Sequence, residues 1–115
     1  MHNNLQLAFA NTIEGIILGA NRVDATMGGL GRGAGNCNME LLLSFLRNPK
    51  FKLRPVLALL QEHFLKLRES VEWGPLVPYN LTGAMNLHPR AAMEWRDGAS
   101  RDDFTAFYDK VVADI

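Results

Sequence analysis

Residues 21–38 read NRVDATMGGLGRGAGNCN, and the interpretation of the rest of the chain depends on them. Residues 22–27 alternate between polar and apolar side chains, a pattern typical of a β-strand. Glycines follow at positions 28, 29, 31, 33 and 35, which indicates positive φ angles or a close approach to another group. A loop of this kind that leads into a helix presents free backbone N–H groups to an anion or a polar substrate. The alternative is a structural turn without a ligand, because many strand-to-helix connections carry glycines.

Composition restricts the classes of partner. The 115 residues suffice for one domain, and 12 basic side chains balance 12 acidic ones. Without a net charge the chain has no global field to attract nucleic acid or an anionic membrane, so we expect neither partner. The single cysteine, Cys37, excludes an intrachain disulfide and predicts a reducing, cytoplasmic location. No apolar run approaches the ~20 residues that span a bilayer.

The rest of the chain is predicted to be mostly helical. Gly19 is placed to end the first helix, Asn38 to cap the second, and Ser100 with Asp103 resembles a capping box at the last. One short strand, 22–27, has no partner strand within the chain. A helix, strand, glycine loop and helix form the repeating unit of a parallel α/β sheet, so we expect part of a larger α/β fold. Apolar spacing predicts helices at 5–18, 39–47, 55–71, 79–87, 89–95 and 101–113.

Three motifs carry a family resemblance. The chain starts with His2-Asn3-Asn4, continues with DATMGGLGRGAGN at 24–36, and later reads YNLTGAMNLHPR at 79–90. In this order they resemble the C-terminal part of the metal-dependent pyruvate-type aldolases, above all 4-hydroxy-2-oxovalerate aldolase. More broadly they resemble the metallolyase superfamily that includes hydroxymethylglutaryl-CoA lyase and isopropylmalate synthase. The resemblance covers most of the chain, about residues 2–95.

This resemblance implies a fold and an activity. The fold is a TIM barrel, with residues 1–48 as its final βα part and residues 49–115 as a helical tail. The activity is cleavage of a carbon–carbon bond in a 4-hydroxy-2-oxo acid. A divalent metal, Mn²⁺ or Mg²⁺, would stabilise the enolate formed as the bond breaks.

The same resemblance implies site residues. His2 matches the second histidine of a metal-binding HxH motif, and Asn36 matches a loop asparagine near or on the metal. Asp24 is expected to hold loop N–H groups. Read from Met1, the sequence lacks the first histidine and the first-strand aspartate, so we expect an incomplete metal site and no catalysis by the chain alone. Substrate-facing positions would be Gly29, Gly31, Arg32, Gly33 and Gly35.

A second hypothesis stays open beside the enzyme. The chain is then a non-catalytic helical module, derived from the aldolase tail, that self-associates or binds a partner protein. The apolar faces of residues 39–47 and 55–71 favour a homo-oligomer, and the unpaired strand could pair across a two-fold axis. The family resemblance also implies a dehydrogenase as a partner.

Overall fold

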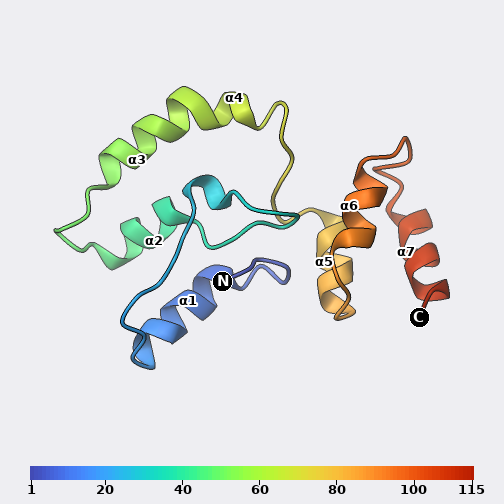
Figure 1. Cartoon of the computed structure of the whole chain (residues 1–115), viewed down its shortest axis with the longest axis horizontal. Helices are drawn as coiled ribbons and strands as arrows, with labels where there is room; N and C mark the ends of the chain where they lie inside the picture. The colour runs from blue at the N-terminus through green and yellow to red at the C-terminus, as the bar shows by residue number, and fades with distance from the viewer.

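The computed structural model describes residues 1–115, and its regular elements are all helical (Figure 1). A single 3₁₀ turn, Met27–Gly29, lies at the start of the glycine loop. The π-helical segment Leu60–Phe64 joins α3 and α4 into one continuous helix, the long helix, which covers residues 53–67. The α-helices are α1 (Ala8–Ile17), α2 (Met39–Leu46), α3 (Leu53–Leu59), α4 (Leu65–Leu67), α5 (Val77–Ala84), α6 (Arg90–Arg96) and α7 (Phe104–Ala113).

The strand predicted at residues 22–27 does not form, whereas the prediction of a mostly helical chain is confirmed. Thr26 forms one isolated parallel bridge with Asn38, and His2 forms one antiparallel bridge with Asn36. Residues 21–24 are exposed and extend along the surface. A strand needs a neighbour for its N–H and C=O groups, and this chain supplies one only at Thr26.

The residues that end and cap the helices agree only in part with those predicted from the sequence. Gly19 follows α1 with a φ of 97°, as a C-terminal glycine does. Asn38 occupies the cap position of α2, but its side chain does not cap the helix. The capping box predicted from Ser100 is wrong, because Asp103 itself caps α7 and accepts a hydrogen bond from the Ala106 N–H at 3.1 Å.

The tail helices α5, α6 and α7 pack around one small core. A residue of the glycine loop, Ala34, belongs to this core and is only 2% exposed. The loop is therefore inserted into the tail although the two are far apart in sequence. The other core members are Tyr79, Ala92, Phe107 and Val111.

A second cluster joins the N-terminal segment to the loop and to α2. It consists of Ala8, Cys37 and Leu42, and an edge-to-face pair between Phe9 and Phe45 extends it, with ring centroids 5.4 Å apart. The N-terminal segment also touches the tail. A Cβ atom at Gly83 would lie 2.7 Å from the Asn4 carbonyl oxygen, so only glycine allows α5 to approach the segment this closely.

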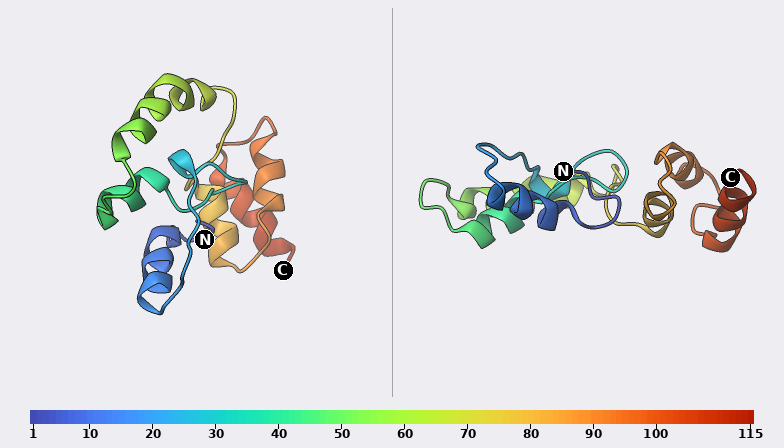
Figure 2. Two further views of the ribbon diagram at one scale, coloured as in Figure 1. Left: turned by 60° about the vertical axis from the view of Figure 1, so that its left-hand side comes forward. Right: turned by 90° about the horizontal axis from the view of Figure 1, so that it is seen from below.

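The whole chain forms a flat layer (Figure 2). It measures 50 × 35 × 15 Å, and its radius of gyration is 16.1 Å against about 13 Å for a compact chain of this length. Its accessible surface is 7980 Å², against about 6,300 Å² for a compact chain of this mass. The helices thus form a single layer and leave large apolar side chains exposed. No helix is long and apolar enough to cross a membrane.

Candidate functional site

His2 and Asn36 lie side by side. The His2 Nδ1 and the Asn36 Oδ1 are 3.0 Å apart, a hydrogen-bond distance between residues 34 positions apart. The backbone holds the two segments together, because the Asn3 N–H donates to the Gly35 carbonyl at 2.9 Å and the Cys37 N–H donates to the Met1 carbonyl at 3.0 Å. The backbone pairing thus places both residues at one point on the molecule.

The Asn36 amide is held from its other end by the glycine loop. Its Nδ2 donates to the Leu30 carbonyl at 3.1 Å, and this orients the oxygen toward His2. A Cβ atom at Gly31 would overlap this Nδ2. At Gly35, where φ is 83°, a Cβ atom would overlap the Gly29 carbonyl oxygen. These two glycines therefore permit the loop to close tightly around Asn36.

Glu40 and Trp73 anchor the start of the loop at Gly28. The Gly28 N–H donates to Glu40 Oε1 at 3.0 Å, and the Gly28 carbonyl accepts from Trp73 Nε1 at 2.9 Å. Arg68, stacked over the Trp73 ring, donates to the same carbonyl at 3.2 Å. Asp24 is exposed and makes none of these bonds, so Glu40 takes the role expected of Asp24. Sequence reasoning missed Trp73 and Arg68, because 40 or more residues separate them from Gly28.

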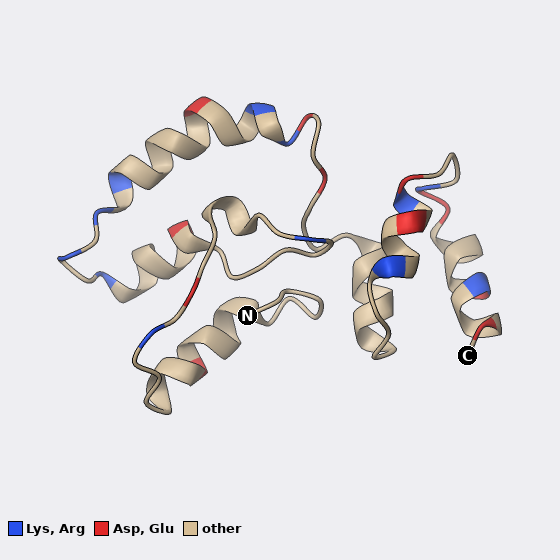
Figure 3. Ribbon diagram, viewed as in Figure 1, with Lys and Arg blue, Asp and Glu red and all other residues tan.

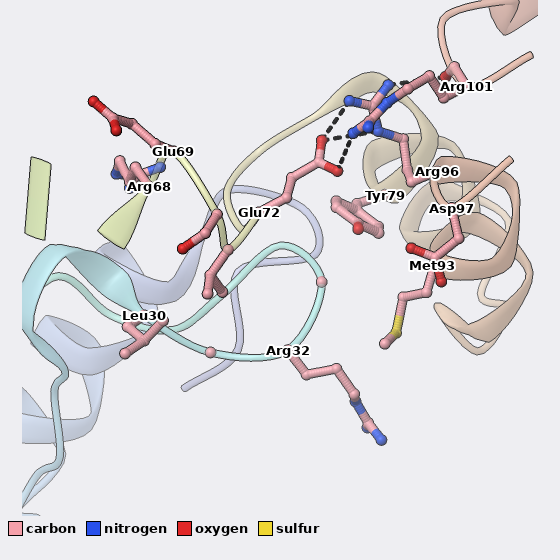
Figure 4. Close-up of a pocket in the computed structure, with 14 residues that line it drawn as sticks. Leu30, Arg32, Arg68, Glu69, Glu72, Tyr79, Met93, Arg96, Asp97 and Arg101 are labelled. Carbon is pink, nitrogen blue, oxygen red and sulfur yellow. Dashed lines mark hydrogen bonds and ion pairs between the residues drawn. The ribbon is translucent and has the colours of Figure 1, made fainter. Parts of the chain in front are cut away.

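A hollow of about 820 Å³ lies between the glycine loop and the tail (Figure 4). Three of the predicted substrate-facing residues line it, namely Gly31, Arg32 and Gly33, whereas Gly29 and Gly35 do not. The other lining residues are Leu30, Arg68, Glu69, Ser70, Val71, Glu72, Tyr79, Met93, Arg96, Asp97 and Arg101.

An ion-pair network forms one wall of the hollow, where charged residues of both signs gather beside α6 (Figure 3). Arg96 is about nine-tenths buried, pairs with Glu72 through two of its nitrogens and donates to Asp102 Oδ1 at 2.6 Å. Arg101 donates to the second Glu72 oxygen at 2.5 Å. The hydrogen bonds that Arg96 donates to Glu72 raise the pKa of Arg96 above its usual value. Both guanidinium groups are thus occupied by carboxylates, whereas Arg32 forms no ion pair.

Tyr79 forms part of the floor of the hollow. It is 4% exposed, and its ring packs in the core of the tail. Burial, and next the negative charge of Glu72, raise the pKa of its phenol above the usual value of about 10. The side chain is therefore a neutral hydrogen-bond donor at physiological pH.

Metal ligation was tested against the side chains present. No group of three or more His, Cys, Asp or Glu side chains lies close enough together to hold a metal ion. His2 and Asn36 offer one imidazole nitrogen and one amide oxygen. His63 is exposed, and His88 accepts a hydrogen bond from the Arg90 N–H, so neither lies with this pair. The chain by itself does not fit a complete site for a hard divalent cation.

A family model matches more than half of the chain. It is described as HMGL-like, and it covers residues 1–68. This range includes the His2–Asn36 pair and the whole glycine loop.

Curated relatives are similar to this chain over short stretches. Oxaloacetate decarboxylase from Mycobacterium tuberculosis is 52% identical over 46 residues, which are 40% of this chain and 14% of that protein. The 4-hydroxy-2-oxovalerate aldolase of Pelotomaculum thermopropionicum is 44% identical over 52 residues, 45% of this chain and 15% of the aldolase. The chain therefore spans about one seventh of the length of these relatives.

One solved structure resembles nearly all of the fold. It is the N-terminal domain of a "putative aldolase" from Bacteroides vulgatus, with a TM-score of 0.70 and 38% sequence identity. The match covers 91% of this chain and 36% of that domain. The arrangement of helices is thus similar to part of a larger aldolase domain.

Proposed function

Since the chain belongs to the HMGL-like family, we propose that it forms part of a divalent-metal-dependent aldolase or lyase that cleaves a carbon–carbon bond in a 4-hydroxy-2-oxo acid. The observation that carries the proposal is the contact between His2 and Asn36. Two residues matched to the family's metal site lie 3.0 Å apart although 34 positions separate them. The similarity to 4-hydroxy-2-oxovalerate aldolase supports the choice of substrate class.

In this proposal the chain supplies part of an active site, and the part is not complete by itself. His2 and Asn36 supply two donors, whereas Mn²⁺ and Mg²⁺ prefer about six, mostly oxygen. The remaining ligands must therefore come from outside these 115 residues, as the 36% coverage of the related domain allows. Because the residues present do not complete a site, we assign no bond-breaking step to this chain alone.

The glycine loop is proposed to face the substrate. Gly31, Arg32 and Gly33 line the hollow and are free to contact a ligand. Gly29 and Gly35 do not line the hollow and instead form hydrogen bonds within the loop. The Gly29 carbonyl accepts from the Asn36 N–H at 2.9 Å, and the Gly35 N–H donates to the Arg32 carbonyl at 3.1 Å. In this proposal the first three make contact and the other two maintain the loop shape.

Manganese titration tests the metal part of this proposal. Mn²⁺ broadens the NMR signals of nearby nuclei, so at low Mn²⁺ concentration the full chain should show the strongest broadening at residues 1–4 and 29–38. The His2→Ala variant should lose it, whereas His63→Ala, an exposed histidine far along the chain, should keep it. Broadening that is strongest elsewhere, or that persists in His2→Ala, would contradict the assignment of His2 and Asn36.

Complementation tests the catalytic part. The chain alone should release no pyruvate from 4-hydroxy-2-oxovalerate in the presence of Mn²⁺. Adding the other part of a related aldolase domain, produced as a separate polypeptide, should restore release. Replacing His2 by alanine should then lower the rate by at least about 10- to 100-fold, the loss that is typical when a partner of a metal ligand is removed. An unchanged rate would count against His2 as a ligand.

A second candidate function is self-association, and the flat shape of the chain favours it. Apolar side chains of α2 and of the long helix are exposed, including Phe45 at 59% and Leu65 at 67%. The surface exceeds that of a compact chain by about 1,700 Å², comparable with a stable protein interface. We expect dimers or larger species in sedimentation experiments, and Phe45→Ser should shift them toward monomer. A stable, folded monomer at tens of micromolar would exclude this function.

A further inference from the structure

The tip of the glycine loop carries four consecutive N–H groups without an acceptor in the chain. They belong to Gly31, Arg32, Gly33 and Ala34. The N–H groups immediately before and after this run, at 28–30 and 35–37, all donate hydrogen bonds. Gly33 and Ala34 are buried, and buried N–H groups are nearly always paired. The chain supplies no partner for these four donors, two of which belong to buried residues.

A buried side chain faces the same hollow without a partner. Tyr79 is 4% exposed and lines the hollow, and its hydroxyl takes part in no hydrogen bond of the chain (Figure 4). The ring lies directly against the loop, since a Cβ atom at Gly33 would be 3.6 Å from two of its carbons. The phenol and residues 31–33 thus border one space, whereas Ala34 lines another cavity. Its raised pKa keeps the phenol protonated, so it can donate to an anion.

The charges around the hollow favour a small ligand with a single negative charge. Arg32 lies at the rim and forms no ion pair. Arg68 also lines the hollow without an ion pair, but its guanidinium donates to the Trp73 and Gly28 carbonyls. Arg96 and Arg101 are neutralised by Glu72 and Asp102. The carboxylates of Glu69 and Asp97 also border the hollow, and they would repel a dianion more strongly than a monoanion.

We propose that the hollow binds the carboxylate group of a small organic acid through the N–H groups of residues 31–33 and the Tyr79 hydroxyl, with Arg32 at its rim. Four donors around one carboxylate satisfy its two oxygens, and hydrogen bonds to an ionised acceptor are the stronger kind. The site adjoins the His2–Asn36 pair, because the Asn36 amide lies against Gly31, but it includes neither residue of the pair. Asn36 lines another cavity of about 260 Å³, together with Asn3 and Cys37, and does not line this hollow.

The choice of a carboxylate rests on the proposed function, in which both the substrate and its 2-oxo acid product carry this group. Binding itself requires no metal and no turnover. Failure of the hollow to bind a carboxylate and failure of the His2–Asn36 metal assignment are therefore separate results.

Titration of the full chain with sodium pyruvate in the presence of EDTA tests the site. Amide NMR spectra should show shifts concentrated at residues 31–34 and at Tyr79, with a dissociation constant in the millimolar range. Tyr79→Phe should weaken binding about fivefold to tenfold through loss of one donor, and the exposed Tyr108→Phe should leave it unchanged. Unchanged affinity in Tyr79→Phe, or no shifts at residues 31–34, would overturn the proposal.

Further titrations test which class of anion binds and where on the molecule it binds. Arg32→Ala removes an exposed side chain and should weaken binding severalfold, so it decides the question if Tyr79→Phe does not fold. Inorganic phosphate should bind more weakly than pyruvate, and equal or tighter phosphate binding would overturn the carboxylate assignment. His2→Ala should bind pyruvate normally. Loss of binding in that variant would place the anion at the His2–Asn36 pair and overturn its placement in the hollow.

Discussion

The indole N–H of Trp73 donates a hydrogen bond of 2.9 Å to the carbonyl of Gly28, across 45 residues of sequence. Trp73 is 3% exposed and lies in the connection between the long helix and α5. Arg68 covers its ring at 4.1 Å from the ring centroid. Through this contact the connection to the tail holds the first residue of the glycine loop, so the loop depends on the tail for its position.

Replacing Trp73 by phenylalanine should destabilise the chain more than the same change at Trp95. Both changes remove part of a ring and leave a gap. Only Trp73→Phe also removes a hydrogen bond, because the Trp95 Nε1 is buried without a partner. Urea unfolding should therefore show an additional loss of about 1 kcal/mol for Trp73→Phe. Equal losses in the two variants would mean that the bond to Gly28 adds nothing to stability.

Removing the Glu40 carboxylate should loosen the same end of the loop. Glu40→Ala leaves the Gly28 N–H without its acceptor and should lower the free energy of unfolding by about 1–2 kcal/mol. Glu40→Gln keeps an amide oxygen in place and should cost less. The matched change Glu62→Ala, at a side chain 67% exposed on the long helix, should be nearly neutral. A cost at Glu62 equal to that at Glu40 would assign the effect to helix propensity.

Alanine substitutions at three glycines should have different effects in the loop and at an ordinary helix position. Gly35→Ala places a Cβ atom against the Gly29 carbonyl at a φ of 83° and should cost more than about 2 kcal/mol. Gly31→Ala should displace the Asn36 amide, which abolishes its NMR contact with His2. Gly15→Ala meets no atom within 4 Å inside α1 and should stabilise by about 0.5–1 kcal/mol. A tolerated Gly35→Ala would contradict the loop geometry.

Local patterns in the sequence predicted the helices well and failed where a distant segment decides the structure. The ranges 39–47 and 101–113 correspond to α2 and α7, because apolar spacing acts within a few turns. The strand at 22–27 failed because pairing needs a neighbour, and the chain pairs only Thr26. An alternating pattern states which face a strand would bury, but it does not supply the partner.

The candidate site shows the same limit. Family resemblance singled out His2, Asn36 and the glycine loop, and the structure places the first two in contact. Tyr79 belongs to a motif that the sequence also singled out, yet its position beneath Gly33 depends on how α5 packs against the loop. Glu72 and Arg96, 24 residues apart, form their ion pair only when α6 docks beside the connection. Such contacts carry no short-range signal.

The raised pKa of Tyr79 predicts how stability responds to alkaline pH. The unfolded chain ionises this phenol near pH 10, whereas the folded chain keeps it protonated to higher pH. Between these values the unfolded state binds fewer protons, so the free energy of unfolding falls as pH rises above about 10. The effect is absent below that pH. Urea unfolding of the Tyr79→Phe variant should show a shallower decline above pH 10 than the original chain, and Tyr108→Phe should retain the steeper one. An identical decline in the Tyr79 variant would show that burial of this phenol does not govern its ionisation.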